Sequence, residues 1–237
     1  MTLISKAFKT LRKYPIRLFF VDITIWTLYI QILNDYYMDV GSMQRVFDWY
    51  SVMGGLNRAG YRELLEFQAK AIKSFISGQD ILVKVPTGSG KTLIPLIYAT
   101  LMIGIGKRCL YVMSTRRLIT QTYNRLVTWF DSLPHYRGKY SIVRVTGDDR
   151  LFLRNIKKAE IIVTTFESLN GLLIKNYEYS LLKKVGLIIV DEMQYIGKIN
   201  RLEDAIVKIR SRLHPPPQTL YLTVKSNSLR SATVEII

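Results

Sequence analysis

The sequence predicts an α/β fold in which helices cover both faces of a doubly wound, mostly parallel sheet. Short apolar stretches rich in β-branched residues alternate along the chain with apolar residues at helical spacing, as in repeated strand–helix units. At 237 residues, of which 49% are hydrophobic, the chain can bury one complete core and still carry extensions. The expected strands lie near residues 81–85, 109–113, 141–145, 160–164, 186–190 and 219–223.

The first expected strand leads into a glycine-rich turn. The stretch 81–85 is apolar and β-branched, and apolar residues recur at helical spacing after the turn, from Leu93 to Leu101. A strand, a glycine-rich turn and a helix in that order are the context of a phosphate-binding loop, because backbone N–H groups and a helix N-terminus attract anions. The residues of the turn are Pro86, Thr87, Gly88, Ser89, Gly90, Lys91 and Thr92.

Each residue type in this turn has a physical reason. Gly88 and Gly90 let the backbone point its N–H groups inward, Lys91 is expected to reach the β- and γ-phosphates, and the Thr92 hydroxyl is expected to ligate Mg²⁺. The sequence therefore predicts ATP and Mg²⁺ as ligands. The general pattern places a glycine where this chain has Val85. A merely flexible turn is the alternative, but the Lys-Thr pair and both flanking elements argue against it.

An acidic pair follows another apolar strand. Asp191 and Glu192 stand directly after the stretch 186–190, at the end of the strand that faces the ligand crevice in parallel sheets. We expect Asp191 to hold Mg²⁺, and Glu192 to orient and deprotonate an attacking water. A solvated acidic turn is the alternative. The phosphate-binding loop upstream favours the catalytic interpretation.

These motifs, in their order from about Leu64 to about Asn227, resemble superfamily 2 helicases of the DExH branch, in the group of Ski-like and archaeal DNA-repair helicases. The resemblance implies a RecA-like P-loop NTPase domain, here placed at residues 46–227. Val85 fits the helicase form of the loop, which reads PTGSGKT. The resemblance also implies that Gln68 reads the adenine edge, since an amide offers both a donor and an acceptor.

The resemblance further implies a set of nucleic-acid contacts. They are Arg116 and Arg117 after the second strand, Thr146 and Gly147 after the third, and Thr165 and Glu167 after the fourth. Ser168 stands where the family usually carries a lysine, so one phosphate contact is missing there. Six tyrosines, which are Tyr111, Tyr123, Tyr136, Tyr140, Tyr177 and Tyr179, are candidates for stacking on bases, although most are expected to pack in the core.

Two motifs depart from the family. Gln194 stands where the branch has a histidine beside the nucleotide, and an amide can donate and accept hydrogen bonds but cannot titrate. The Ser-Ala-Thr motif is replaced near Thr223 by unrelated residues, whereas a literal Ser-Ala-Thr occurs at 231–233. The first alignment is preferred. Either alignment indicates damage to the element that links hydrolysis to strand movement.

The composition favours a polyanionic partner. The chain has 34 basic and 18 acidic residues and a formal net charge of +16, which suits nucleic acid or an acidic membrane surface. The resemblance favours DNA over RNA. It also implies a second RecA-like domain, which the chain ends without, so that a partner polypeptide is one expected source of it. The competing hypotheses are an active helicase motor and a nucleotide- and nucleic-acid-binding module with little turnover of its own.

The ends of the chain fall outside the resemblance. Residues 1–45 combine basic residues with an apolar run, which predicts a helical N-terminal extension. The run is short for a membrane anchor and contains Asp22, so a membrane role is the less favoured interpretation. Residues 228–237 are expected to form a C-terminal tail. The single cysteine, Cys109, lies in an expected buried strand and suits a reducing, cytoplasmic setting.

Overall fold

The computed structural model describes residues 56, 64–134, 136–146, 156–174, 182–193, 199–224 and 232–237. The expected N-terminal extension at residues 1–45, Gly147 and Gln194 lie outside these residues. Within them, no helix combines the length and the apolar character that crossing a membrane requires.

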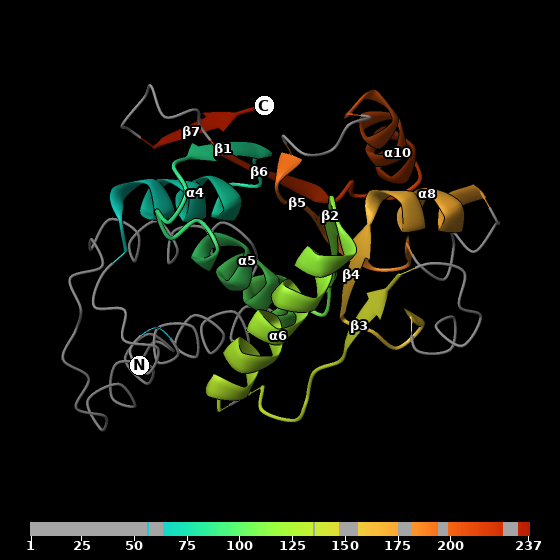
Figure 1. Ribbon diagram of the computed structural model, residues 1–237, viewed down its shortest axis with the longest axis horizontal. Helices are drawn as coiled ribbons and strands as arrows, with labels where there is room; N and C mark the ends of the chain where they lie inside the picture. Colours follow the sequence, from blue (N-terminus) through green and yellow to red (C-terminus); the bar gives the residue numbers. More distant parts are fainter. Residues whose placement is uncertain are drawn as a thin grey trace, which may run out of the picture.

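Seven strands of the described chain form one sheet, in the order β3-β4-β2-β5-β6-β1-β7 (Figure 1). The first six strands pair in parallel, and β7 pairs antiparallel with β1. This arrangement confirms the predicted mostly parallel α/β sheet. The strands are β1 (Ile81–Val85), β2 (Arg108–Met113), β3 (Ile142–Val145), β4 (Ile161–Thr165), β5 (Val185–Val190), β6 (Gln218–Val224) and β7 (Thr233–Ile236).

The strand β7 lies in residues 228–237, which were expected to form a C-terminal tail. It extends the sheet at the edge of β1, and Lys84 pairs with Glu235 across the two strands at 2.8 Å. The N–H of Ile237 also donates to the carbonyl of Asp80. The short, half-polar sequence of β7 gives little local signal, because its conformation depends on pairing with a strand about 150 residues earlier in the chain.

Helices cover both faces of the sheet, as predicted. One buried cluster joins residues of α4, α5 and α6 to one face, and a second joins residues of α8 and α10 to the other face (Figure 1). The five helices are α4 (Glu66–Ile76), α5 (Leu93–Gly104), α6 (Arg116–Ser132), α8 (Phe166–Ile174) and α10 (Ile199–Ser211). Alternate residues of β2 divide between the two clusters, because successive strand side chains point to opposite faces.

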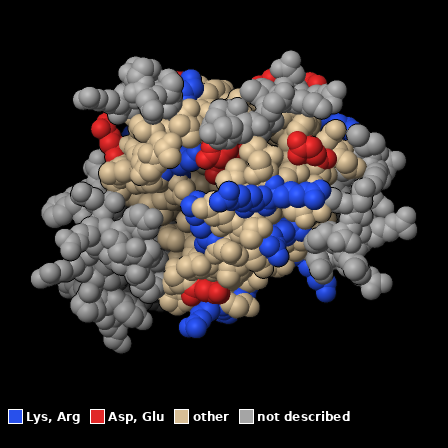
Figure 2. Space-filling view, in the orientation of Figure 1, with Lys and Arg blue, Asp and Glu red and all other residues tan. Residues whose placement is uncertain are grey.

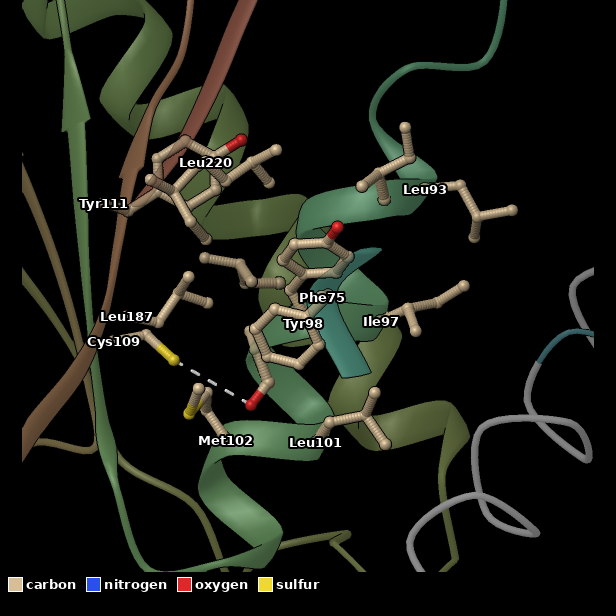
Figure 3. Close-up of a cluster of buried hydrophobic side chains, with 14 of the residues drawn as sticks. Phe75, Leu93, Ile97, Tyr98, Leu101, Met102, Cys109, Tyr111, Leu187 and Leu220 are labelled. Atoms are coloured by element: carbon tan, nitrogen blue, oxygen red, sulfur yellow. Dashed lines mark hydrogen bonds between the residues drawn. The ribbon is translucent and has the colours of Figure 1, made fainter. Parts of the chain in front are cut away.

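The helix that follows the glycine-rich turn is almost completely enclosed. In α5, nearly every residue from Leu93 to Ile103 is buried, so the helix is apolar on all sides. Figure 3 shows side chains of α4, α5 and the sheet meeting beside it. The rings of Phe75 and Tyr98 stack there with their centroids 3.9 Å apart. This packing holds α5 between α4 and the sheet.

The buried face of α6 combines apolar and polar side chains. Its buried residues are Ile119, Thr122, Leu126, Trp129 and Phe130. The indole N–H of Trp129 donates to the hydroxyl of Thr100 on α5, at 2.9 Å. Trp129 can therefore be buried, because its indole N–H has a hydrogen-bond acceptor on the neighbouring helix.

The amino ends of the strands are tied together by charged side chains. Asp80, before β1, accepts a hydrogen bond from the N–H of Thr219 on β6 at 2.7 Å and pairs with Arg210 of α10. Arg108, the first residue of β2, is buried and donates to the backbone carbonyls of Ile156, Ala159 and Lys183. Burial lowers the pKa of the Arg108 guanidinium. These contacts hold loops and strands together at this end of the sheet.

Candidate functional site

The glycine-rich turn and the acidic pair meet at the opposite end of the sheet. The turn follows β1, the acidic pair follows β5, and only β6 separates these strands. The Lys91 Nζ atom lies 2.6 Å from Glu192 Oε1 and 3.6 Å from Asp191 Oδ1. Two segments 101 residues apart in the sequence therefore form one polar cluster at the carboxyl ends of the strands.

The turn has the backbone conformation that its glycines permit. Gly88 and Gly90 have φ angles of 78° and 85°, in the left-handed region that side chains disfavour. Helix α5 begins at Leu93, with Thr92 as its N-cap residue. The Lys91 ammonium and the positive end of the α5 dipole thus stand at the same place, which is the arrangement that attracts phosphate.

Asp191 is buried and held from several directions. The residue is 6% exposed, its Oδ2 accepts a hydrogen bond from the Tyr111 hydroxyl at 3.0 Å, and its Oδ1 accepts one from the N–H of Glu192 at 2.8 Å. Burial raises the pKa of Asp191, and the nearby charge of Lys91 opposes that rise. The carboxylate is therefore kept in a place where its charge is costly without a cation.

Glu192 adopts an unusual backbone conformation. Its φ angle is 56°, which costs a residue with a Cβ about 1–2 kcal/mol. Such local strain is commonly stored at functional sites. In this conformation, the Oε1 atom of Glu192 accepts a hydrogen bond from the Lys91 ammonium.

Gln68 is buried beside the glycine-rich turn. It is 3% exposed, its Oε1 accepts from the N–H of Leu65 at 2.9 Å, and its Nε2 donates to the carbonyl of Gly90 at 2.9 Å. Both ends of the amide are engaged within the protein. Gln68 thus links the start of α4 to the glycine-rich turn, and its pairing with adenine stays a prediction.

The expected nucleic-acid contacts follow β2, β3 and β4, which are neighbours in the sheet. Arg116 and Arg117 are exposed at the start of α6, Thr146 follows β3, and Glu167 is exposed at the start of α8. Figure 2 shows basic side chains gathered over α6, in the middle of the face of the molecule that is turned to the viewer. The carboxyl edge of the sheet therefore carries the expected contacts beside the polar cluster.

The Thr165 hydroxyl bonds to the first turn of α8. The residue is 5% exposed, and its hydroxyl oxygen accepts from the N–H of Ser168 at 3.1 Å and lies 3.0 Å from the Ser168 hydroxyl. Both bonds lie in the first turn of α8. Ser168, at the place of the family's lysine, thus bonds to Thr165 across this turn.

Sequence reasoning missed the neighbour of the acidic pair. Tyr111 was a candidate for base stacking, but it is 1% exposed and donates to Asp191, so that its ring cannot meet a base. Tyr136 is likewise buried, and Tyr123 instead carries the guanidinium of Arg144 over its ring at 4.7 Å. The pairing of β2 with β5 brings Tyr111 to Asp191, and that pairing is not evident from either strand alone.

Comparison with known proteins gives a consistent result. The family model described as "DEAD/DEAH box helicase" matches residues 65–235. The protein named ATP-dependent DNA helicase Hel308 from Pyrobaculum calidifontis is 30% identical over 159 residues, which cover 65% of this chain and 21% of that protein. The DExH-box ATP-dependent RNA helicase DExH15 of Arabidopsis thaliana is 29% identical over 140 residues, which cover 57% of this chain and 11% of that protein.

Solved structures share the fold. The helicase MrfA bound to DNA and AMPPNP superimposes with a TM-score of 0.64 at 21% identity, covering 75% of this chain and 26% of that one. The Mycobacterium smegmatis helicase Lhr bound to ssDNA and AMP-PNP gives a TM-score of 0.62 at 23% identity, covering 73% and 24%. This chain spans about a fifth of the length of the Hel308 protein. With the family match over most of its length, the chain belongs to the DEAD/DEAH box helicases of superfamily 2 and contains their N-terminal RecA-like domain.

Proposed function

We propose that this chain is the ATP-binding motor domain of a nucleic-acid helicase, in which hydrolysis of ATP drives translocation or unwinding. The observation that carries the proposal is the contact of Lys91 with Asp191 and Glu192 at the carboxyl end of the sheet. A cation, a glycine-rich turn and a buried carboxylate in one cluster are what binding a triphosphate with its metal requires. Homologues named as ATP-dependent helicases support the use of ATP.

The residues of the cluster divide the work of hydrolysis. Lys91 and the N–H groups of the turn bind the β- and γ-phosphates, and this competes with the ion pair between Lys91 and Glu192. Glu192, once released, accepts a proton from the water that attacks the γ-phosphorus, while the bond to the bridging oxygen breaks and ADP leaves. Thr92 and Asp191 would hold Mg²⁺, which neutralises charge on the phosphate oxygens when it is bound.

The nucleic-acid partner is inferred from charge and from relatives. Arg116 and Arg117 offer two exposed guanidinium groups at the carboxyl edge, and the whole chain has a net charge of +16. DNA is favoured over RNA, since DNA helicases from two archaea match over more of this chain than the Arabidopsis RNA helicase does.

The second candidate is a module that binds nucleotide and nucleic acid but hydrolyses little ATP alone. The replaced residues around Thr223, where the family carries its Ser-Ala-Thr motif, favour this candidate. A second RecA-like domain on a partner polypeptide would then supply the arginines that stabilise charge on the transferred phosphoryl group, which are worth on the order of 10³–10⁵ in rate.

Steady-state ATPase measurements with and without single-stranded DNA test the proposal. Turnover that DNA stimulates, and that Lys91→Ala abolishes, is expected of a motor. The control is Lys73→Ala, which removes one exposed charge on α4. Nucleotide binding without turnover would favour the binding module. No affinity for ATP in the presence of Mg²⁺ would contradict both.

A second measurement addresses the nucleic acid. The double variant Arg116→Ala and Arg117→Ala is expected to weaken binding of single-stranded DNA and to lower the slope of log affinity against log salt by about 1–2. Arg137, which is exposed in the turn after α6, provides the matched control Arg137→Ala. An unchanged salt slope in the double variant would remove these arginines from the interface.

A further inference from the structure

A fully buried tyrosine ends at the acidic pair. Tyr111 lies on β2, and its ring belongs to the buried apolar cluster on the α5 side of the sheet (Figure 3). Its hydroxyl donates to Asp191 Oδ2 at 3.0 Å. A buried hydroxyl needs a partner, and here the partner is the carboxylate expected to hold Mg²⁺.

The two oxygens of Asp191 are held by different groups. Oδ1 receives the N–H of Glu192 and faces Lys91, whereas Oδ2 receives the hydroxyl of Tyr111. The backbone N–H of Asp191 is bound as well, since it donates to the carbonyl of Val112 at 3.0 Å. Among these contacts, the Tyr111 hydroxyl is the one that fixes Oδ2 and therefore the rotation of the carboxylate plane.

The hydroxyl is confined beside Asp191, because Tyr111 is 1% exposed and its ring packs in the apolar cluster on this face of the sheet. Rotation of the hydroxyl out of this bond would leave it unpaired among apolar side chains, which costs about 1–3 kcal/mol.

We propose that Tyr111 is a positioning residue that orients the Asp191 carboxylate for magnesium. The inference rests on the proposed function, because it assumes that Asp191 holds the metal. Hydrogen-bond donors behind a metal-ligating carboxylate typically contribute 10–100-fold to metal affinity. Tyr111 itself touches neither the metal nor the nucleotide.

The test is the magnesium dependence of nucleotide binding by Tyr111→Phe. This change removes one oxygen and keeps the ring in the core. Titration of a fluorescent ATP analogue into the full chain, once with Mg²⁺ and once with EDTA, gives the enhancement due to the metal. We expect the affinity in EDTA to be unchanged and the enhancement to fall at least tenfold.

Tyr98→Phe is the matched control. Tyr98 is also 1% exposed, lies in the same cluster, and donates its hydroxyl to a backbone carbonyl, that of Ala71. The same atom is lost from the same core without any change at a carboxylate. Its magnesium enhancement is expected to equal that of the wild type.

The double variant Tyr111→Phe with Asp191→Asn shows whether the tyrosine acts through Asp191. Once Asp191→Asn has removed the charge, Tyr111→Phe is expected to have no further effect on the enhancement. An equal loss in both backgrounds would overturn the proposal, and so would full enhancement in Tyr111→Phe alone. A wild-type chain that binds no nucleotide would overturn the proposed function and this inference with it.

Thermal unfolding covers the case of a variant that does not fold. Loss of folding in Tyr111→Phe that Asp191→Asn restores would support the proposal, because the hydroxyl would then be needed only beside the ionised carboxylate. Unfolding of both Tyr111→Phe and the double variant, with Tyr98→Phe folded, would instead assign Tyr111 a packing role and overturn the proposal.

Discussion

The two ends of the sheet use charged residues differently. At the amino end, Arg108 donates to three backbone carbonyls and Asp80 is bound by Arg210 and by an N–H of β6. At the carboxyl end, Lys91 faces two carboxylates, and Glu192 adopts a left-handed backbone conformation. The charges at the amino end are held by hydrogen bonds and ion pairs within the protein. At the carboxyl end, the single ammonium of Lys91 faces the two carboxylates of Asp191 and Glu192.

This difference separates stability from function. Charges bound by backbone groups hold the strands and loops together, so their loss leaves buried carbonyls unpaired. At the carboxyl end, burial makes the charge of Asp191 unfavourable, as the raised pKa of this carboxyl group indicates. Substitutions of the charged residues at the amino end should therefore lower stability and spare nucleotide binding and turnover. Substitutions of the charged residues at the carboxyl end should change nucleotide binding or turnover at a smaller cost in stability.

The largest expected effect is that of Glu192→Gln on turnover. Removal of the general base should lower the ATPase rate by about 10²–10⁴-fold, while nucleotide affinity stays within a factor of a few. Steady-state turnover and a nucleotide titration on the same sample measure both quantities. Glu203→Gln, which changes an exposed carboxylate on α10, is the control. Equal turnover in the wild type and Glu192→Gln would remove Glu192 from the chemistry.

The next effect is that of Arg108→Met on stability. Loss of the guanidinium removes a donor from three backbone carbonyls, of which that of Ile156 still accepts the N–H of Ala159. Each buried carbonyl left without a donor costs about 1–3 kcal/mol. We expect the free energy of unfolding to fall by about 3 kcal/mol in urea denaturation. Arg137→Met, at an exposed site, should change it by less than about 0.5 kcal/mol. A weaker affinity for nucleotide in folded Arg108→Met would contradict the separation of the two ends.

A smaller effect is expected of Gly90→Ala. Its φ angle is 85°, and an added Cβ would lie 3.1 Å from Nε2 of Gln68. The strain amounts to about 1–2 kcal/mol, and the displaced turn should bind nucleotide more weakly. Gly78→Ala is the matched control, since its φ angle is 77° and nothing lies within 4 Å of the added Cβ. Both variants should lose similar stability, and only Gly90→Ala should lose nucleotide affinity, as calorimetric titration would measure.

The smallest effect concerns the thiol of Cys109. The side chain is fully buried on β2, and burial, together with the charge of Glu160, raises the pKa of the thiol. Because the thiolate is the reactive form and burial both disfavours it and blocks access, an alkylating reagent should leave the native protein unmodified. Mass spectrometry after iodoacetamide treatment, with and without denaturant, measures the reaction. Rapid modification of the native chain would contradict the burial of β2.

Local signals predicted the fold and the two segments that form the candidate site. The six parallel strands, the glycine-rich turn and the acidic pair all have patterns that depend on neighbouring residues in the sequence. The contacts of Gln68 with Gly90 and of Tyr111 with Asp191 have no such local pattern, because strand pairing and helix packing bring these distant residues together. The edge strand β7 was missed for the same reason. Contacts between distant segments were what the sequence left open.

Hydrogen exchange with and without Mg²⁺ and a non-hydrolysable ATP analogue tests the central claim most directly. The account predicts slower exchange in peptides covering 86–93 and 190–193, and unchanged exchange in peptides covering 78–81 and 208–219. Protection at the amino end of the sheet, or no protection around Lys91 at saturating ligand, would contradict it.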